Sequence, residues 1–500
     1  MVANFPKRER ERYISRRLVW TGLLELTSPC HLGGADADAT SDRPLLRDGE
    51  GRPYLPGATL TGLLRGLLTR VDKDAAQALF GANWGDPEGK QARLLLSDAP
   101  IEQAESIPTE LRDGVAIEAC SGVAAKNKKY DLELLPVGVR FRLCGQLELF
   151  GEPKKDESLL RGLLRILLAL EKGQLVLGAR TRRGFGETRL IAGPEGYWQV
   201  EDYRLDTPAG WYAWLARQLH GLPEDWPMDW PKVAPVAFQN TAALAKYLEM
   251  DLPQSTETRD FSVTLNLKLA GSLLVGSEGH DPDQPDRSHL QRLHWRDGAS
   301  SLESVLPATS LGGVLRHRCR RIALTLASQA GKQDAAETLV CEMFGPAEIV
   351  RNGRTWASRV TVREAAISGG KPLRHTRVRI DPWTGGAVES LLFTEDAQYR
   401  GEVRLELRLQ ASNEDWAGPA RALLLLALRD LAAGELTVGA ESGVGRGRLQ
   451  PLPGKPFAIV TEPSVKLYLQ DDGTVRCEPA TAFQAEFSAL RRYLGIGDGQ

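Results

Sequence analysis

One pattern of motifs occurs twice in this chain of 500 residues, and it constrains the fold more than any other feature. The first copy begins at about residue 18 and the second at about residue 261. Each runs from a strand into a Gly-containing turn, an acidic loop, an amphipathic helix, a Phe-Gly pair, an Arg-containing strand, a long hairpin and a terminal Gly/Arg loop. A motif order that is kept twice indicates two copies of one fold.

Six pairs of anchor residues carry this comparison. They are Gly33 and Gly276, Pro56 and Pro307, Phe80 and Phe344, Arg93 and Arg359, Val115 and Val378, and Gly178 and Gly439. The separations range from 243 to 266 residues, so small insertions shift the second copy without changing the order. Two unrelated α+β domains would have to produce this order by chance, and we therefore favour duplication.

The composition is that of an ordinary soluble globular protein, with 42% hydrophobic and 26% charged residues. No apolar run approaches the roughly 20 residues that span a bilayer, and the N-terminus lacks the apolar core of a secretory signal. The six cysteines form no CxxC pair and the seven histidines no HExxH spacing, which argues against a structural zinc site and a disulfide framework. We expect a cytoplasmic protein with no membrane partner.

The net charge of −2 neither indicates nor excludes nucleic-acid binding, because local charge decides that question. Most basic clusters in the sequence are explained well enough as solvated helix or hairpin faces. The segment GARTRRGFG differs because it places three arginines among three glycines. Glycine lets the backbone approach a phosphate and arginine neutralises it. The segment is not a dinucleotide-binding motif, because it lacks the pattern of a strand followed by GxGxxG and a helix.

Hydrophobic spacing predicts the same elements in both copies. In the first copy we expect strands at 17–27, 92–98 and 138–149, helices at 58–70 and 156–171, a hairpin at 112–135, and a strand, Gly loop and strand at 174–190. In the second we expect strands at 261–271 and 401–410, helices at 309–328 and 416–434, a hairpin at 374–395 and a Gly loop at 439–447. This order is ferredoxin-like and is also used by RNA-recognition modules. The predicted fold class is α+β, with two tandem ferredoxin-like domains that each carry an inserted hairpin.

We divide the chain into a first domain at 1–196, a connector at 197–258, a second domain at 259–455 and a C-terminal extension at 456–500. The connector holds five of the 11 tryptophans, and four prolines fall within residues 223–235. We interpret it as an ordered segment that docks on a domain or a neighbour. A platform on which bases stack is the alternative.

Four segments of the first copy resemble the RAMP superfamily, and specifically the backbone subunit of type III CRISPR effector complexes. These segments are HLGGADADATSDRPLLRDGEGRPYLPGATLTGLLRGLL, RLLLSDAP, RDGVAIEACSGVAAKNKKYDLELLPVGVRF and GARTRRGFGETRL. The second copy matches in the same order, and the likeness covers most of 18–190 and 261–450. The chain thus resembles two such subunits fused in one polypeptide, and its hairpins resemble the family's thumbs.

The resemblance implies a function in antiviral defence. Members of the family bind guide (CRISPR) RNA, their thumbs displace bases of the guide–target duplex at regular intervals, and a loop aspartate supports metal-dependent cleavage of the single-stranded target RNA. The implied partners include further RAMP subunits and the large polymerase-like subunit of type III complexes. Two alternatives stay open: a non-catalytic scaffold that binds guide RNA, and a stand-alone endoribonuclease that processes guide precursors.

The family's aspartate falls on Asp42 in DRPLLRDG, with Asp36 and Asp38 as the runners-up. Both its catalytic role and its role as a ligand of a divalent metal, for which Mg²⁺ is the expected ion, are implied by the resemblance. The chemistry is reasonable, since one carboxylate can recruit a metal ion or orient the attacking 2′-hydroxyl of RNA.

In the second copy, the flanking anchors place the counterpart of Asp42 between residues 285 and 291, where Asp286 is the only acid. We assign it the same catalytic and metal-binding roles, with Asp281 and Asp283 nearby. The second loop is longer and lacks a match to Pro44. Binding of RNA without cleavage therefore stays open for this copy.

The remaining candidates are residues expected to contact RNA. In the first copy they are His31, Lys126, Lys128, Lys129, Arg180, Arg182 and Arg183. In the second they are Arg377, Arg379, Arg446 and Arg448. Because the second Gly loop has only two arginines, we expect it to hold phosphates less strongly than the first.

Overall fold

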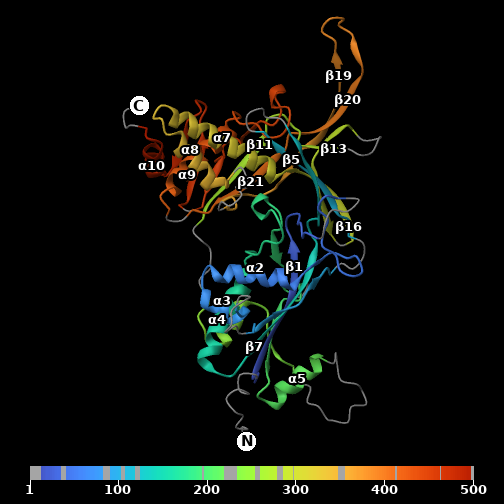
Figure 1. The fold of residues 1–500 in the computed structure, drawn as a ribbon, viewed down its shortest axis with the longest axis vertical. Coiled ribbons are helices and arrows are strands. Elements are labelled where there is room, and N and C mark those ends of the chain that lie inside the picture. Colours follow the sequence, from blue (N-terminus) through green and yellow to red (C-terminus); the bar gives the residue numbers. More distant parts are fainter. Residues whose placement is uncertain are drawn as a thin grey trace.

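The computed structural model describes residues 13–34, 41–82, 91–102, 107–118, 124–193, 196–218, 234–253, 260–278, 285–296, 298–346, 355–411, 414–461 and 463–496. They form two α+β domains, which lie one above the other in Figure 1. In each domain, helices cover one face of an antiparallel sheet. The predicted fold class and the two-copy organisation are confirmed.

The first domain follows the predicted order. Its elements are β1 (Arg16–Leu26), β2 (Tyr54–Leu55), α2 (Gly57–Thr69), α3 (Lys73–Phe80), β3 (Leu94–Leu96), β4 (Ala99–Pro100), β5 (Glu110–Ile117), β6 (Ala124–Leu134), β7 (Arg140–Leu149), α4 (Pro153–Glu171), the 3₁₀ turn η1 (Thr181–Arg183) and β8 (Thr188–Leu190). The central strands lie in the order β8–β1–β7–β3, and each neighbouring pair is antiparallel. This is the strand order of a ferredoxin-like sheet, with the first and third strands in the middle.

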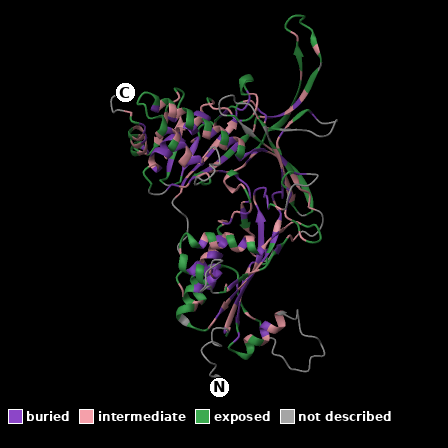
Figure 2. Cartoon of the chain, viewed as in Figure 1, coloured by how far each residue is buried: buried purple, intermediate pink, exposed green. Residues whose placement is uncertain are grey.

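Leucines at helical spacing explain how the helices cover this sheet. Leu160, Leu163, Leu164 and Leu167 of α4 are buried, and they recur at intervals of three and four residues, as on one face of a helix. They pack in one core with Leu18, Leu24 and Leu26 of β1 and with Leu60, Leu64 and Leu68 of α2. Figure 2 shows this core as a buried layer between the helices and the sheet.

The second domain repeats the arrangement. Its elements are β11 (Phe261–Leu269), β12 (Ser272–Leu273), β13 (Gly276–Glu278), β14 (Arg287–His289), β15 (Gln291–Arg296), β16 (Ala299–Leu306), α7 (Ala308–Ser328), α8 (Gln333–Phe344), β17 (Val360–Val362), β18 (Ala365–Ser368), β19 (Lys371–Ile380), β20 (Ala387–Tyr399), β21 (Glu402–Leu409), α9 (Ala417–Ala432), the 3₁₀ turn η3 (Ser442–Val444) and β22 (Leu449–Pro451). The order β22–β11–β21–β17 matches that of the first domain. The sequence did not lead us to expect the β15–β16 hairpin or the helices α3 and α8, which end at the two Phe-Gly pairs.

The two thumbs, β5–β6 and β19–β20, agree residue by residue. Val115 pairs with Lys129 and Ile117 with Ala124, with a shift of register between them. In the second thumb, Val378 pairs with Leu392 and Ile380 with Ala387, with a shift at the same place. Every paired position is displaced by 263 residues. The second thumb extends away from both domains at the top of Figure 1.

The segments after each Gly loop also correspond. The 197–258 segment contributes β9 (Gln199–Arg204), α5 (Pro208–Gln218), β10 (Val236–Phe238) and α6 (Thr241–Tyr247). The C-terminal segment contributes β23 (Ala458–Val460), β24 (Val465–Leu469), β25 (Val475–Glu478) and α10 (Gln484–Leu494). β9 pairs with β1, and β23 pairs with β11, so the repeat continues beyond the Gly loops. Trp198 is buried edge-on against Trp20 of β1, which docks the start of the 197–258 segment on the first domain.

The base of the first thumb lies against the second domain. Arg112 of β5 donates to both carboxylate oxygens of Glu364, which lies between β17 and β18. Glu110 accepts a hydrogen bond of 3.0 Å from the backbone N–H of Leu293. Burial would lower the pKa of Arg112, but the charges of Glu364 and Glu110 outweigh burial and raise it. These buried contacts fix the position of one thumb relative to the other domain.

In the described part of the chain, every helix is too short or too polar to cross a membrane.

Candidate functional site

Asp42 lies exposed in the loop between β1 and β2 and is tied to the base of the first thumb. Its Oδ2 accepts a hydrogen bond of 3.0 Å from the backbone N–H of Asp131 in β6. The described residues provide no partner for Oδ1 of Asp42. One oxygen of this carboxylate thus fixes its position, while the side chain as a whole stays exposed.

Asp286 makes the same contact in the second domain. Its Oδ2 accepts a hydrogen bond of 2.7 Å from the backbone N–H of Thr394 in β20. Thr394 and Asp131 are 263 residues apart, the separation found for every paired position of the thumbs. The structure therefore places Asp286 at the position equivalent to that of Asp42.

The backbone around each aspartate supports this equivalence. The N–H of Leu46, four residues after Asp42, donates to the carbonyl of Leu32 at 2.8 Å. The N–H of Leu290, four residues after Asp286, donates to the carbonyl of Val275 at 2.9 Å. Leu32 and Val275 are separated by 243 residues, as are the anchors Gly33 and Gly276. The catalytic roles of the two aspartates stay predictions. Asp36, Asp38, Asp281 and Asp283 lie outside the described residues.

Three carboxylates meet at the first site. Asp113 and Asp131 are opposite each other on β5 and β6, and Asp42 lies beside Asp131. A hydrogen bond to Asp113, together with the negative charges of Asp113 and Asp42, raises the pKa of Asp131, while Lys129 opposes the change. Lys129 is 3.3 Å from the Asp113 carboxylate. The site is therefore locally acidic beside a basic thumb strand.

The Gly loop lies next to this site. Gly178 has a φ of +72° and Arg180 a φ of +60°, both in the left-handed region, and the N–H of Ala179 donates to the carbonyl of His31 at 3.0 Å. Arg180 stacks over the ring of Tyr130, 4.4 Å from its centroid, and Nη1 donates to the tyrosine hydroxyl. Arg43 lies 5.7 Å from the same ring. Two guanidinium groups thus flank the residue that precedes Asp131.

The other basic candidates of the first copy lie in three different environments. His31 is buried, and its Nδ1–H donates to the carbonyl of Glu133 at 2.9 Å. Burial and the charges of Arg180 and Arg43 lower the pKa of His31, so it is neutral near pH 7. Arg182 donates to Thr361 of the second domain at 3.1 Å. Lys126 and Arg183 are exposed, and the side chain of Lys128 lies outside the described residues.

In the second copy, Arg446 and Arg377 take part in internal ion pairs. Arg446 is only 3% exposed and lies 3.0 Å from Glu395 and 3.1 Å from Glu441. Arg377 lies 2.8 Å from Glu441. In this conformation Arg446 has no surface to offer to RNA. Arg379 and Arg448 are exposed.

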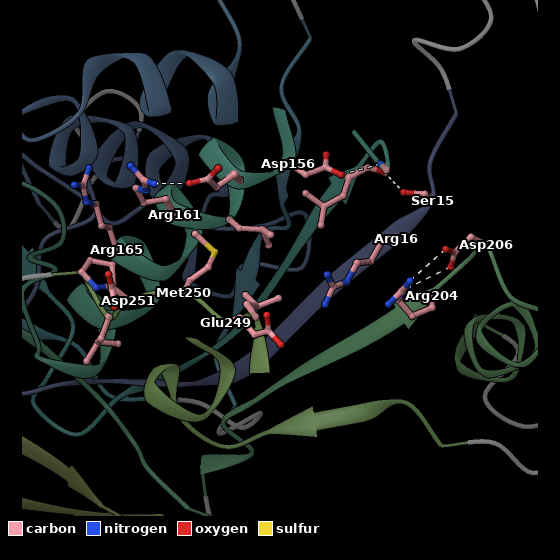
Figure 3. A pocket seen from close by; sticks show the side chains of 17 residues that line it. Ser15, Arg16, Asp156, Arg161, Arg165, Arg204, Asp206, Glu249, Met250 and Asp251 are labelled. Atoms are coloured by element: carbon pink, nitrogen blue, oxygen red, sulfur yellow. Dashed lines mark hydrogen bonds and ion pairs between the residues drawn. The ribbon is translucent and has the colours of Figure 1, made fainter. Parts of the chain in front are cut away.

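A separate cavity of about 960 Å³ opens beside the start of β1, the end opposite to the one that leads into the Asp42 loop (Figure 3). It is lined by arginines, but acids neutralise them. Arg161 lies 2.6 Å from Glu157, and Arg204 lies 3.3 Å from Asp206. We therefore place the functional site at the thumb bases and not in this cavity.

Fold and site together define a tandem ferredoxin-like protein in which each domain holds an exposed aspartate at the base of a thumb. A family model of the RAMP superfamily matches residues 23–189 and 273–450. The chain belongs to this superfamily and contains two copies of its domain, as the sequence predicts. The chain is also similar to a curated protein of Methanocaldococcus jannaschii, "CRISPR system Cms endoribonuclease Csm3". The identity is 23% over 212 residues, which cover 37% of this chain and 84% of that protein.

Proposed function

We propose that the chain is a fused double backbone subunit of a type III CRISPR effector complex, which binds guide RNA and cleaves complementary target RNA. The tethering of Asp42 to the thumb base carries this proposal, because it fixes a carboxylate where the thumb meets the body of the domain. The double match to the RAMP superfamily and the similarity to a CRISPR endoribonuclease support it.

The role that we propose for Asp42 is to orient the RNA at the scissile position. Cleavage by the neighbouring 2′-hydroxyl requires that the attacking oxygen, the phosphorus and the leaving oxygen lie in line. The hydrogen bond from Asp131 N–H fixes one oxygen of the Asp42 carboxylate, so that the other can accept a hydrogen bond from the 2′-hydroxyl or hold a cation. Asp286 has the same geometry and would act in the same way.

The donor set suits a metal ion that is shared with the substrate. Among the described residues, no group of three or more His, Cys, Asp or Glu side chains is arranged to hold a metal ion. Mg²⁺ is usually bound by one or two carboxylates together with substrate phosphates and water, and Asp42 and Asp286 fit this mode. When bound, such an ion would neutralise charge on the phosphate. We propose Mg²⁺ as the cofactor on this basis.

The basic residues around the first site would hold the RNA backbone. Arg180, Arg183 and Lys126 offer donors near the first thumb base and along the thumb, and Arg379 and Arg448 offer them in the second copy. Further RAMP subunits and the large polymerase-like subunit are the protein partners that we propose, in the cytoplasm and in antiviral defence. Base pairing with the guide would select the target, so we assign no sequence-reading role to a side chain.

The test is target cleavage by the complex purified with its bound RNA. We expect guide RNA to co-purify and a labelled complementary RNA to be cut in Mg²⁺ but not in EDTA. Asp42→Asn should slow one cut by about 100-fold or more. Asp48→Asn is a matched control in the same loop, because Asp48 caps a local turn through Arg52.

Two results would contradict the proposal. If Asp42→Asn and Asp286→Asn leave every cut in place, the chain is a scaffold. If the isolated chain trims precursor RNA without other subunits or metal, it is a processing enzyme.

A further inference from the structure

Equivalent positions at the two thumb bases carry different charges. In the first domain these positions hold Gly114, Tyr130, Leu132, Arg180 and Phe185. In the second, they hold Arg377, Phe393, Glu395, Glu441 and Arg446, displaced by 263 residues in the thumb and 261 in the Gly loop. The backbone is conserved between the copies, since Arg180 and Glu441 both have a φ of +60°. The two domains therefore have the same backbone conformation at this position and differ in their side chains.

In the first domain, these side chains orient Arg180 toward the thumb. A Cβ on Gly114 would lie 2.0 Å from Cζ of Tyr130, so only glycine lets this ring lie across β5. The ring then supports the guanidinium of Arg180 on its face, and its hydroxyl accepts from Nη1. Leu132 and Phe185 pack together in one small buried cluster. Arg180 has five N–H donors, and within the described residues Tyr130 is the one partner recorded for them.

In the second domain the corresponding charges neutralise one another. Glu441 replaces Arg180 and accepts from Arg377 at 2.8 Å and lies 3.1 Å from Arg446. Glu395, which is 1% exposed, lies 3.0 Å from Arg446. Burial would raise the pKa of Glu441, but the hydrogen bonds to Glu395 and Arg377 and the charges of Arg446 and Arg377 outweigh burial and lower it, so Glu441 is ionised near pH 7. Arg377 and Arg446 are therefore both paired with acidic side chains of the same domain, and no arginine occupies the position of Arg180.

We propose that Arg180, positioned by Tyr130, binds an RNA phosphate at the first thumb base, and that Glu441 removes this phosphate site from the second domain. The inference rests on the proposed function for its link to cleavage. The two domains then hold equivalent aspartates but differ in phosphate binding, and the first position is cut faster than the second.

The test compares variants in the purified complex with its guide, using a labelled complementary RNA. Arg180→Gln should slow the cut assigned to Asp42 by about tenfold or more without slowing the cut assigned to Asp286. Arg180→Lys should restore part of the rate, because lysine keeps the charge but loses the planar fork. Tyr130→Phe keeps the ring but loses the hydroxyl and should fall between Arg180→Gln and wild type.

A second measurement does not depend on cleavage. In a plot of the logarithm of RNA affinity against the logarithm of salt concentration, the slope should become shallower by roughly 0.7 for Arg180→Gln. One phosphate contact to a single strand is then lost. Phe393→Tyr is the matched control in the second thumb and should change neither the slope nor either cut, since Glu441 lies where Arg180 would be. Unaltered thermal unfolding will show that the variants fold.

The outcomes separate this inference from the proposed function. If wild-type complex cuts the RNA but Arg180→Gln changes neither the ratio of the cuts nor the salt slope, Arg180 is not the phosphate ligand, and the proposed function stands. If wild-type complex leaves the RNA intact while Arg180→Gln still lowers the salt slope, the cleavage proposal fails and the phosphate site stands.

Discussion

His289 is a buried histidine that ties the acidic loop of the second domain to the strand before it. Its Nδ1 accepts a hydrogen bond of 3.2 Å from the N–H of Val275, and Asp286 lies three residues earlier in the chain. Burial lowers the pKa of His289 from 6.5 to about 4. The histidine is therefore neutral in the folded protein at any pH near 7.

This lowered pKa predicts a pH-dependent stability. Between pH 6.5 and about 4 the unfolded chain binds a proton that the folded chain does not, so the contribution is present above pH 6.5 and is lost as pH falls. At pH 5 the loss is about 2 kcal/mol. Denaturant unfolding at pH 7.5 and pH 5 measures it. His289→Gln should reduce the difference between the two pH values, and an unchanged difference would contradict this explanation.

At the scale of elements, the second Gly loop contains two glycines that are required for different reasons. Gly445 and Gly447 both have positive φ, of +89° and +76°. A Cβ on Gly447 would lie 1.9 Å from the carbonyl oxygen of Val438, whereas a Cβ on Gly445 would meet open space. The loop is thus constrained by backbone contact at one glycine and by φ alone at the other.

Alanine at these two glycines should have unequal effects. Gly445→Ala should cost about 1 kcal/mol of unfolding free energy, the usual penalty of a left-handed residue. Gly447→Ala should cost several times more, because the clash is with backbone that cannot move aside. Thermal unfolding of the two variants provides the comparison. Equal destabilisation by both would show that the contact with Val438 is not limiting.

Most of the helices and strands were predictable from the sequence, because the patterns that indicate them lie within short segments of the chain. Periodic leucines predict α4, and the motif order predicts both thumbs and the position of Asp286. The burial of Arg446 was not predictable, because its partner Glu395 lies 51 residues away in the chain and meets it only in the folded thumb base. The β15–β16 hairpin was missed because its charged residues are typical of a solvated loop, although Arg292 and His294 pair with Glu303 across it.

At the scale of the whole molecule, a buried charged contact holds the domains together. The side chains of Arg112 and Glu364 are 6% and 1% exposed, and Arg292 lies 3.7 Å from the same glutamate. Gly184 of the first Gly loop also packs here, because a Cβ on it would lie 2.8 Å from both Ala308 and the N atom of Glu364. Because this contact fixes the two domains relative to each other, we expect it to fix the distance between Asp42 and Asp286.

Breaking one partner of this contact should loosen the domains. Glu364→Gln leaves the buried guanidinium of Arg112 without full charge compensation and should cost about 3–5 kcal/mol. The triple variant Arg112→Met, Glu110→Gln and Glu364→Leu should recover much of that loss, because Arg112 and both of its acidic partners are then uncharged. Hydrogen exchange at the backbone N–H of Leu293, which donates to Glu110 of the first domain, reports docking. The account is wrong if the single variant exchanges as slowly as wild type.

The most direct test of the central claim is to map both ends of every product cut from a labelled target RNA by wild type, Asp42→Asn and Asp286→Asn complexes. We predict two cuts at a fixed spacing in wild type, loss of one in Asp42→Asn and loss of the other in Asp286→Asn. A pattern in which both variants lose the same cut, or in which the spacing varies with the target, would contradict two equivalent sites held in one chain.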